Sequence, residues 1–154
     1  MKSKIFVLII LAFFACNNAN KPLTEADKEK NITEAKNLTS KIYRAAENMD
    51  AVKLTSTFLD SPDFIPLING EYGNFEQTVK KYPLLMSEFK TQKATILTEK
   101  YVVVDASTIA YISKSKWVCK LKNDSIATYD NCGVQLILKK SDNIWKVLSW
   151  TEVY

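Results

Sequence analysis

The chain has 154 residues and a formal net charge of +4, and 47% of its residues are hydrophobic, which is typical of a packed globular domain. It contains no histidine, which excludes His-ligated zinc and any imidazole general base. Three cysteines and three glycines are too few for a sulfur-rich metal site or a glycine-rich phosphate loop. We therefore expect neither a metal nor a cofactor. The lysines form no dense basic stripe, so nucleic acid is not an expected partner.

A short leader opens the chain. Met1–Lys4 carries two lysines and precedes the unbroken apolar run Ile5–Phe14, which is followed by Ala15 and Cys16. The run is too short to span a bilayer as a helix, which takes about 20 residues. This is the layout of a secretory signal peptide. We predict that residues 1–15 are removed and that lipidated Cys16 anchors the protein to the membrane. The protein would then be a bacterial lipoprotein on the periplasmic or outer-membrane face of the cell envelope.

The residues before Cys16 leave a second interpretation open. Bacterial lipoprotein signals usually carry leucine and then a small residue where this chain has Phe13 and Phe14. In the alternative, an ordinary signal peptide is cleaved and Cys16 has no special role. Residues 16–23 form a polar tether in either case, and 24–154 form one domain.

Helical periodicity dominates the start of the domain. Apolar residues recur at helical spacing over about 24–48, and Thr24 is placed to act as the N-cap of this helix. Asp50 is placed to cap a shorter helix, over about 51–59. The sequence therefore predicts two successive helices.

A hairpin and a third helix are expected next. Phe64–Ile68 has the character of a short strand, and Asn69-Gly70 is a strong two-residue turn signal. Asn74 is placed to cap a helix in which Gln77 takes the third position. Pro83 interrupts this helix, so we expect a kink or a break near it.

The second half of the domain has strand periodicity. We predict four strands, over residues 93–104, 108–121, 128–140 and 144–154, separated by short polar turns. Helices come first and a long antiparallel meander comes last. This order indicates an α+β fold.

The end of the chain resembles a known superfamily. Gly133–Val147, which includes the turn Ser141-Asp142-Asn143 followed by Ile144-Trp145-Lys146-Val147, resembles the closing hairpin of the nuclear-transport-factor-two-like superfamily. The long first helix, Asp50 and Phe64–Glu71 fit this resemblance, which covers about residues 30–154. It implies a curved antiparallel sheet wrapped around the N-terminal helices as a cone, with an apolar pocket at its open end.

Strand parity predicts which side chains would face the interior of such a cone. Polar groups among aromatic rings suit a pocket for a small ligand, because apolar walls give affinity and a few polar groups give orientation. In the alternative, the aromatic side chains simply fill the core. The candidate pocket-lining residues are Tyr43, Asp63, Tyr111, Ser113, Trp117, Ser149 and Thr151.

Asp63 is the best candidate for an acid or base. The resemblance implies that enzymes of the superfamily, in the steroid-isomerase and polyketide-cyclase (SnoaL-like) branches, use Asp, His or Tyr inside the cone. Burial against apolar walls would raise the pKa of Asp63 towards neutrality, and Tyr43 or Tyr111 would be its partner. In the alternative, Asp63 only caps a turn after Pro62. The other acidic strand residues are expected on the solvated surface: Glu99, Asp105 and Glu152.

Cys119 and Cys132 fall on the apolar faces of neighbouring strands, and strand register decides whether they meet. A turn at Asn123-Asp124 would place Cys119 opposite Thr128, which leaves the two sulfurs too far apart. A longer loop centred near Ser125-Ile126 would pair the two cysteines. A disulfide is chemically allowed in an exported protein, so both alternatives stay open.

Three functions are compatible with the sequence. The first is non-enzymatic binding of a small apolar or amphipathic ligand, or of a protein partner, at the cell envelope. The missing histidine favours this function over catalysis. The second is an isomerase, dehydratase or hydrolase that uses Asp63 with Tyr43 or Tyr111. The third is a homodimeric interaction module that pairs through the outer face of its sheet.

Overall fold

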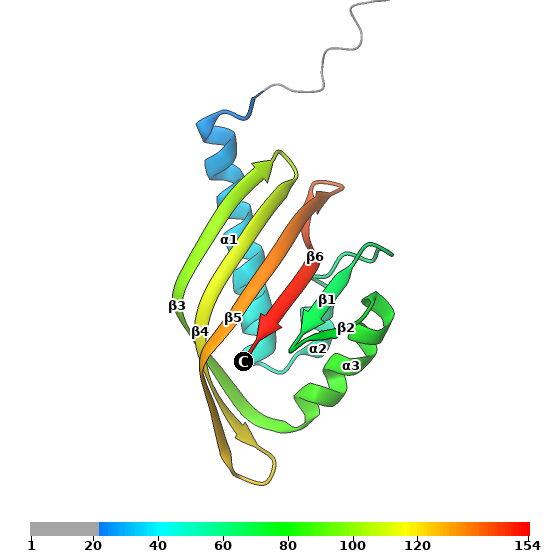
Figure 1. The fold of residues 1–154 in the computed structure, drawn as a ribbon, viewed down its shortest axis with the longest axis vertical. Helices are drawn as coiled ribbons and strands as arrows, with labels where there is room; N and C mark the ends of the chain where they lie inside the picture. The colour runs from blue at the N-terminus through cyan, green and yellow to red at the C-terminus, as the bar shows by residue number, and fades with distance from the viewer. Residues whose placement is uncertain (1–21) are drawn as a thin grey trace, which may run out of the picture.

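The computed structural model of the protein describes residues 22–154, so the leader and Cys16 lie outside the described part. That part contains three helices and six strands (Figure 1). None of the helices in it is long and apolar enough to cross a membrane. In chain order the elements are α1 (Glu25–Glu47), α2 (Ala51–Thr55), β1 (Ile65–Ile68), β2 (Glu71–Tyr72), α3 (Phe75–Ser87), β3 (Phe89–Asp105), β4 (Thr108–Leu121), β5 (Ile126–Ser141) and β6 (Ile144–Val153).

Side-chain caps start the first two helices where the sequence predicts. The hydroxyl oxygen of Thr24 accepts a hydrogen bond from the backbone N–H of Asp27 at 3.1 Å, and the Asp27 carboxylate accepts one from the N–H of Thr24 at 3.2 Å. The Asp50 carboxylate accepts from the N–H of Lys53 at 2.9 Å. These bonds satisfy N–H groups that have no partner inside a helix. The second helix is shorter than expected and ends at Thr55.

The third helix also begins at its predicted cap. Asn74 and Gln77 exchange two hydrogen bonds, at 2.9 and 3.2 Å, and form a second capping box. The helix does not break at Pro83, as α3 continues through this proline to Ser87. Met86 is buried in the core beyond the proline, so packing holds the helix on that side despite the lost backbone hydrogen bond.

The strands form one curved sheet with the order β2-β1-β6-β5-β4-β3. Strands β3 to β6 are an antiparallel meander, and β1 joins the edge of β6 in parallel. Figure 1 shows the sheet curving around α1, with α2 and α3 gathered beside β1 and β2. The structure therefore confirms the predicted α+β architecture, with N-terminal helices packed in the concave face of a mostly antiparallel sheet.

Two irregularities in the meander decide which residues face inward. Between Val147 and Ser149, β6 advances two residues while β5 advances one, so Leu148 is an extra residue in β6. Between Ser115 and Trp117, β5 carries the extra residue. A bulge of this kind reverses the alternation of side chains along the bulged strand.

Helix α1 runs along the length of the molecule, and a cluster of aromatic rings packs between the other helices and the sheet. The N-terminus of α1 lies at the same end as the β3–β4 turn (Figure 1). The C-terminal half of α1 runs towards the opposite end, where the chain passes from α3 into the start of β3. Aromatic rings fill the space between α2, α3 and the sheet, with ring centroids 5.1 to 6.2 Å apart: Phe58, Phe64, Phe75, Tyr82 and Trp150.

Candidate functional site

An apolar cavity of about 170 Å³ lies between the C-terminal half of α1, α3 and the inner face of the sheet. Eight of its lining residues are aromatic, and one of its lining side chains, that of Glu152, is acidic. The lining residues are Ile42, Tyr43, Ala46, Leu54, Ile68, Tyr82, Leu85, Met86, Phe89, Gln92, Tyr111, Trp117, Cys119, Tyr129, Cys132, Val134, Leu136, Trp150, Glu152 and Tyr154. The hollow expected inside the cone is therefore present.

Three of the predicted pocket residues line this cavity: Tyr43, Tyr111 and Trp117. The rings of Tyr43 and Trp117 stack with centroids 6.0 Å apart, so α1 and β4 supply one aromatic wall. Ser113 is buried directly behind this wall, where its hydroxyl lies 2.9 Å from the Tyr43 hydroxyl. These residues come together because β4 keeps its alternation along the inner face of the sheet.

One hydroxyl in this region is poorly satisfied. Among residues 22–154, the Tyr111 oxygen is the one buried side-chain polar atom without a hydrogen bond of standard geometry, although the hydroxyls of Ser113 and Tyr43 lie beside it. Tyr111 is completely buried, and this burial raises the pKa of its hydroxyl. The hydroxyls of Tyr43, Tyr111 and Ser113 therefore form one polar cluster within and behind this wall.

Glu152 on β6 carries the acidic group of the site. Its carboxylate accepts a hydrogen bond from the Trp150 indole N–H at 3.1 Å, and the residue is only partly exposed. Burial raises the pKa of Glu152 to about 7, while the Trp150 hydrogen bond acts in the opposite direction. Near neutral pH this carboxyl therefore exists in both its protonated and its ionised form.

The groups around Glu152 respond to its charge. Burial, and then the Glu152 charge, raise the pKa of the Tyr82 hydroxyl well above its usual value. The same two causes, in the same order, raise the pKa of the Cys132 thiol to about 11 and also raise that of Tyr154. Cys132 is therefore a protonated thiol near neutral pH and a poor nucleophile.

Strand register shows how the two polar walls are arranged. Ser113 on β4 pairs with Val134 on β5, which pairs with Glu152 on β6. Two strand spacings separate the hydroxyl wall from the carboxyl wall, which is about 10 Å between their backbones. Val134 forms the apolar floor between them. A ligand in the cavity would meet apolar contacts in the middle and polar groups at its sides.

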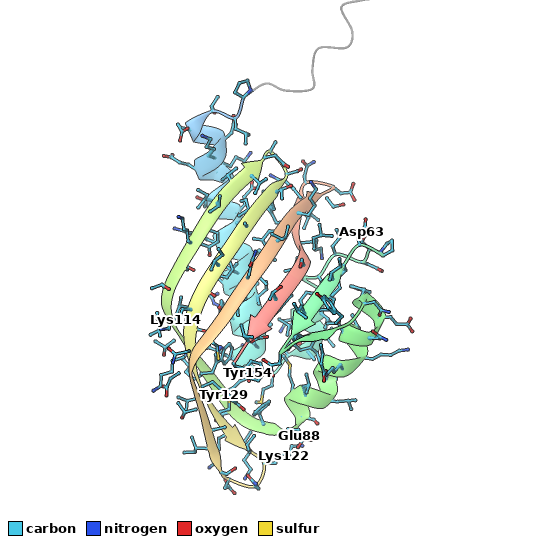
Figure 2. The ribbon with its side chains drawn as sticks, viewed as in Figure 1. Asp63, Glu88, Lys114, Lys122, Tyr129 and Tyr154 are labelled. Carbon is cyan, nitrogen blue, oxygen red and sulfur yellow. The ribbon has the colours of Figure 1, made fainter. Side chains whose placement is uncertain are left out.

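Two residues near the end of the sheet sit at the rim of the cavity. The rings of Tyr129 and Tyr154 meet edge to face, with centroids 5.2 Å apart, and both residues line the cavity. Figure 2 shows them together at the lower end of the sheet, above Glu88 and Lys122. Tyr154 keeps 57% of its surface exposed, and Leu85 on α3 keeps 40%, so the cavity approaches solvent at these two lining residues.

Ser149 and Thr151 do not line the cavity, and Glu152 does, which corrects the expected placement of all three residues. The cause is the bulge at Leu148: without it, Ser149 would continue the inward face of Val147. With it, Trp150 and Glu152 face inward, and the Ser149 hydroxyl instead donates a hydrogen bond to the Ile65 carbonyl at 3.0 Å.

Asp63 lies away from the cavity, contrary to the expected pairing with Tyr43 or Tyr111. It is exposed in the turn before β1, and its backbone N–H donates a hydrogen bond to the Ser61 hydroxyl at 3.1 Å. Figure 2 places Asp63 at the other side of the molecule from Tyr129 and Tyr154. This position matches the alternative in which Asp63 belongs to a turn.

Cys119 and Cys132 line the cavity as free thiols. The β4–β5 turn follows Leu121, and Cys119 pairs with Ala127 while Cys132 pairs with Ser115. This is close to the register predicted for the shorter turn, with the β5 bulge moving the partner of Cys119 by one residue. The structure therefore favours the alternative without a disulfide.

The chain is similar in fold to several solved structures. No protein-family model matches the chain, and no curated protein matches it either. A nuclear transport factor 2 (NTF2-like) superfamily protein from Salmonella enterica serovar Typhimurium superposes with a TM-score of 0.74 and 10% identity, over 82% of this chain and 92% of that chain.

Two further solved structures have the same arrangement. The hexachlorocyclohexane dehydrochlorinase LinA-type3 from Novosphingobium barchaimii superposes with a TM-score of 0.71 and 12% identity, over 84% of this chain and 90% of that chain. An NTF-2-like protein of unknown function from Shewanella oneidensis has a TM-score of 0.62 and 16% identity, over 79% and 98% of the two chains. At such low identity these similarities identify the architecture alone, and the domain has the NTF2-like fold.

Proposed function

We propose that the protein is a binding domain for a small, largely apolar ligand, held at the cell envelope by its N-terminus, and that the ligand occupies the cavity between α1, α3 and the sheet. The observation that carries this proposal is Glu152, a carboxyl built into the wall of an otherwise apolar, aromatic cavity. A carboxyl at such a position lowers the stability of the folded protein, and polar groups in the wall of an apolar pocket commonly serve to orient a bound ligand.

The volume of the cavity sets the size of the ligand. An engineered cavity of about 150 Å³ in another protein, lined by aliphatic and aromatic residues, binds benzene. The cavity of about 170 Å³ in this protein therefore suits a ligand with one six-membered ring and a short substituent. The exposed lining residues Tyr154 and Leu85 mark where such a ligand would enter.

A cavity-filling substitution tests this proposal. Ala46 lies on α1 and lines the cavity, and leucine is also a good helix former. We expect Ala46→Leu to weaken binding of 2-phenylethanol, measured by calorimetry or by NMR titration, about tenfold or more. We expect it to leave thermal stability unchanged or raised, because the added side chain fills empty space.

The control for this experiment is Ala26→Leu, at an exposed position of the same helix. It should leave binding unchanged. If 2-phenylethanol, toluene and other single-ring probes all fail to bind the wild-type protein, the proposed function is wrong. Equal binding by the Ala46→Leu variant would place the ligand elsewhere.

An acid–base enzyme is the second candidate function. It is favoured by the same carboxyl, because a group that titrates near neutrality can both donate and accept a proton. Glu152 would take the role that the sequence suggested for Asp63. Turnover of a bound probe by the wild-type protein, lost in a Glu152→Gln variant, would favour catalysis over simple binding.

A further inference from the structure

We infer that the ligand of this cavity is a small organic cation, in which an ammonium group is attached to a single-ring apolar body and meets the carboxylate of Glu152. This inference rests on the proposed function and adds the charge of the ligand to it. Three features of the cavity wall support it: an acidic side chain without an ion-pair partner, aromatic rings beside that side chain, and no basic side chain.

The first argument is charge. Glu152 carries the one acidic side chain in the cavity wall, and no lysine or arginine of residues 22–154 lines the cavity. Each ion pair found within residues 22–154 involves other acidic residues, and none involves Glu152. A half-buried carboxylate that has one hydrogen-bond donor and no cation is unfavourable. A cationic ligand would supply the missing partner.

The second argument is the set of rings beside the carboxyl. Trp150 donates its indole hydrogen to Glu152 at 3.1 Å, and its ring lies 6.2 Å from that of Tyr82. Tyr154 lies close enough for the Glu152 charge to act on it. Aromatic faces attract ammonium groups, and cages of such rings are a common means of holding alkylated ammonium ligands. Trp150 meets the carboxyl with its N–H edge, so Tyr82 and Tyr154 are the rings beside Glu152 that would offer a face to an ammonium group.

The third argument concerns the groups that face Glu152 from every packed element. None of them is basic: α3 contributes Tyr82, β5 contributes Cys132 and Val134, β1 contributes Ile68, and β6 contributes Trp150 and Tyr154. An anionic ligand would find no positive charge and would be repelled by the ionised carboxylate. A neutral ligand could bind only the protonated carboxyl without leaving a charge uncompensated.

This difference gives cations and neutral molecules different pH dependences. The cation requires ionised Glu152, so its affinity should rise as the pH passes upward through the pKa of this group, which is about 7. A neutral ligand should bind equally well or less tightly as the pH rises. When only a fraction of the protein is in the state that can bind, the apparent affinity is the intrinsic affinity multiplied by that fraction.

The experiment compares three probes of matched size: 2-phenylethylammonium, 2-phenylethanol and 3-phenylpropanoate. Binding to the wild-type protein is measured by calorimetry at pH 5.5 and pH 8, where the amine stays protonated. We expect the ammonium probe to bind about tenfold or more tightly at pH 8 than at pH 5.5 and to exceed both other probes at pH 8. The carboxylate probe should be the weakest of the three.

A charge-removing variant provides the second measurement. Glu152→Gln keeps the shape and an oxygen acceptor for Trp150, and it should weaken ammonium binding at pH 8 about tenfold or more and abolish its pH dependence. It should leave 2-phenylethanol binding within a few-fold. Glu29→Gln, at an exposed position on α1, is the matched control and should behave as the wild type does.

The outcomes separate this inference from the function on which it rests. If 2-phenylethanol binds as tightly as the ammonium probe at pH 8, the cavity binds ligands but its preference for cations is disproved. If ammonium binding is insensitive to pH in the wild-type protein, the role of Glu152 is disproved without any need for the variant. If none of the three probes binds, both the inference and the proposed function fail.

Discussion

Glu152 faces the cavity because of a single extra residue, Leu148, in the preceding part of its strand. Within the cavity wall its carboxyl has Trp150 as a hydrogen-bond donor and no cationic neighbour. The protein keeps a group in place that would be more stable in water, and burial raises the pKa of that group from 4.5 to about 7. Such a shift has a consequence for folding as well as for binding.

The stability of the protein should depend on pH through Glu152. In the unfolded chain the carboxyl titrates near 4.5, and in the folded protein near 7. Between these values the folded state binds more protons, so the free energy of unfolding should decrease as the pH rises, by about 3 kcal/mol in all. Glu152→Gln should therefore be more stable than the wild type at pH 8 and similar to it near pH 4.5.

Urea denaturation of both proteins across this pH range measures the effect. Glu29→Gln is again the control, because Glu29 is exposed and its removal should change stability by less than about 0.5 kcal/mol. A wild-type protein that is more stable at pH 8 than Glu152→Gln would mean that the carboxylate is compensated in the folded state.

At the scale of elements, α3 shows how local sequence signals position the site. It carries Tyr82, Leu85 and Met86 to the cavity, and the Asn74 capping box fixes where it begins. Asn74→Ala should lower the free energy of unfolding by about 1 kcal/mol, because one N–H of the first turn loses its partner. Chemical denaturation measures this loss, and Asn37→Ala, an exposed position within α1, should show no such loss.

The elements also show how far the sequence could predict the site. Caps at Thr24, Asp50 and Asn74 and the alternation of β4 are local signals, so these helix starts and the inward positions of Tyr111 and Ser113 could be predicted. The inward positions on β6 could not. A bulge depends on how a strand pairs with its neighbour, and simple alternation after Val147 assigns each later residue to the wrong face.

The sequence of β6 also contains a signal that indicates its inward face correctly. Trp150 is a large aromatic residue that favours burial, and placing it inward also turns Glu152 inward. Choosing the face by Trp150 rather than by counting from Trp145 would have found the acidic group. Asp63 differs, because only the tertiary structure shows that the turn before β1 lies away from the cavity.

At the scale of the whole molecule, the proposed envelope attachment has its own test. We expect the protein purified from a bacterial membrane fraction to begin at Cys16 and to carry acyl chains on that residue, which intact-protein and peptide mass spectrometry would detect. Cys16→Ser should lose the acyl mass and leave the membrane fraction. A mature terminus at any other residue, or an unmodified Cys16, would contradict the attachment.

The direction of α1 has a consequence for such an attached protein. The helix starts at the end of the molecule away from the rim formed by Tyr129 and Tyr154 (Figure 2). A protein held by its N-terminus would therefore have its rim on the side far from the attachment point. Its cargo would reach that side from the surrounding water, in which an ammonium compound dissolves far better than in the hydrocarbon of a bilayer.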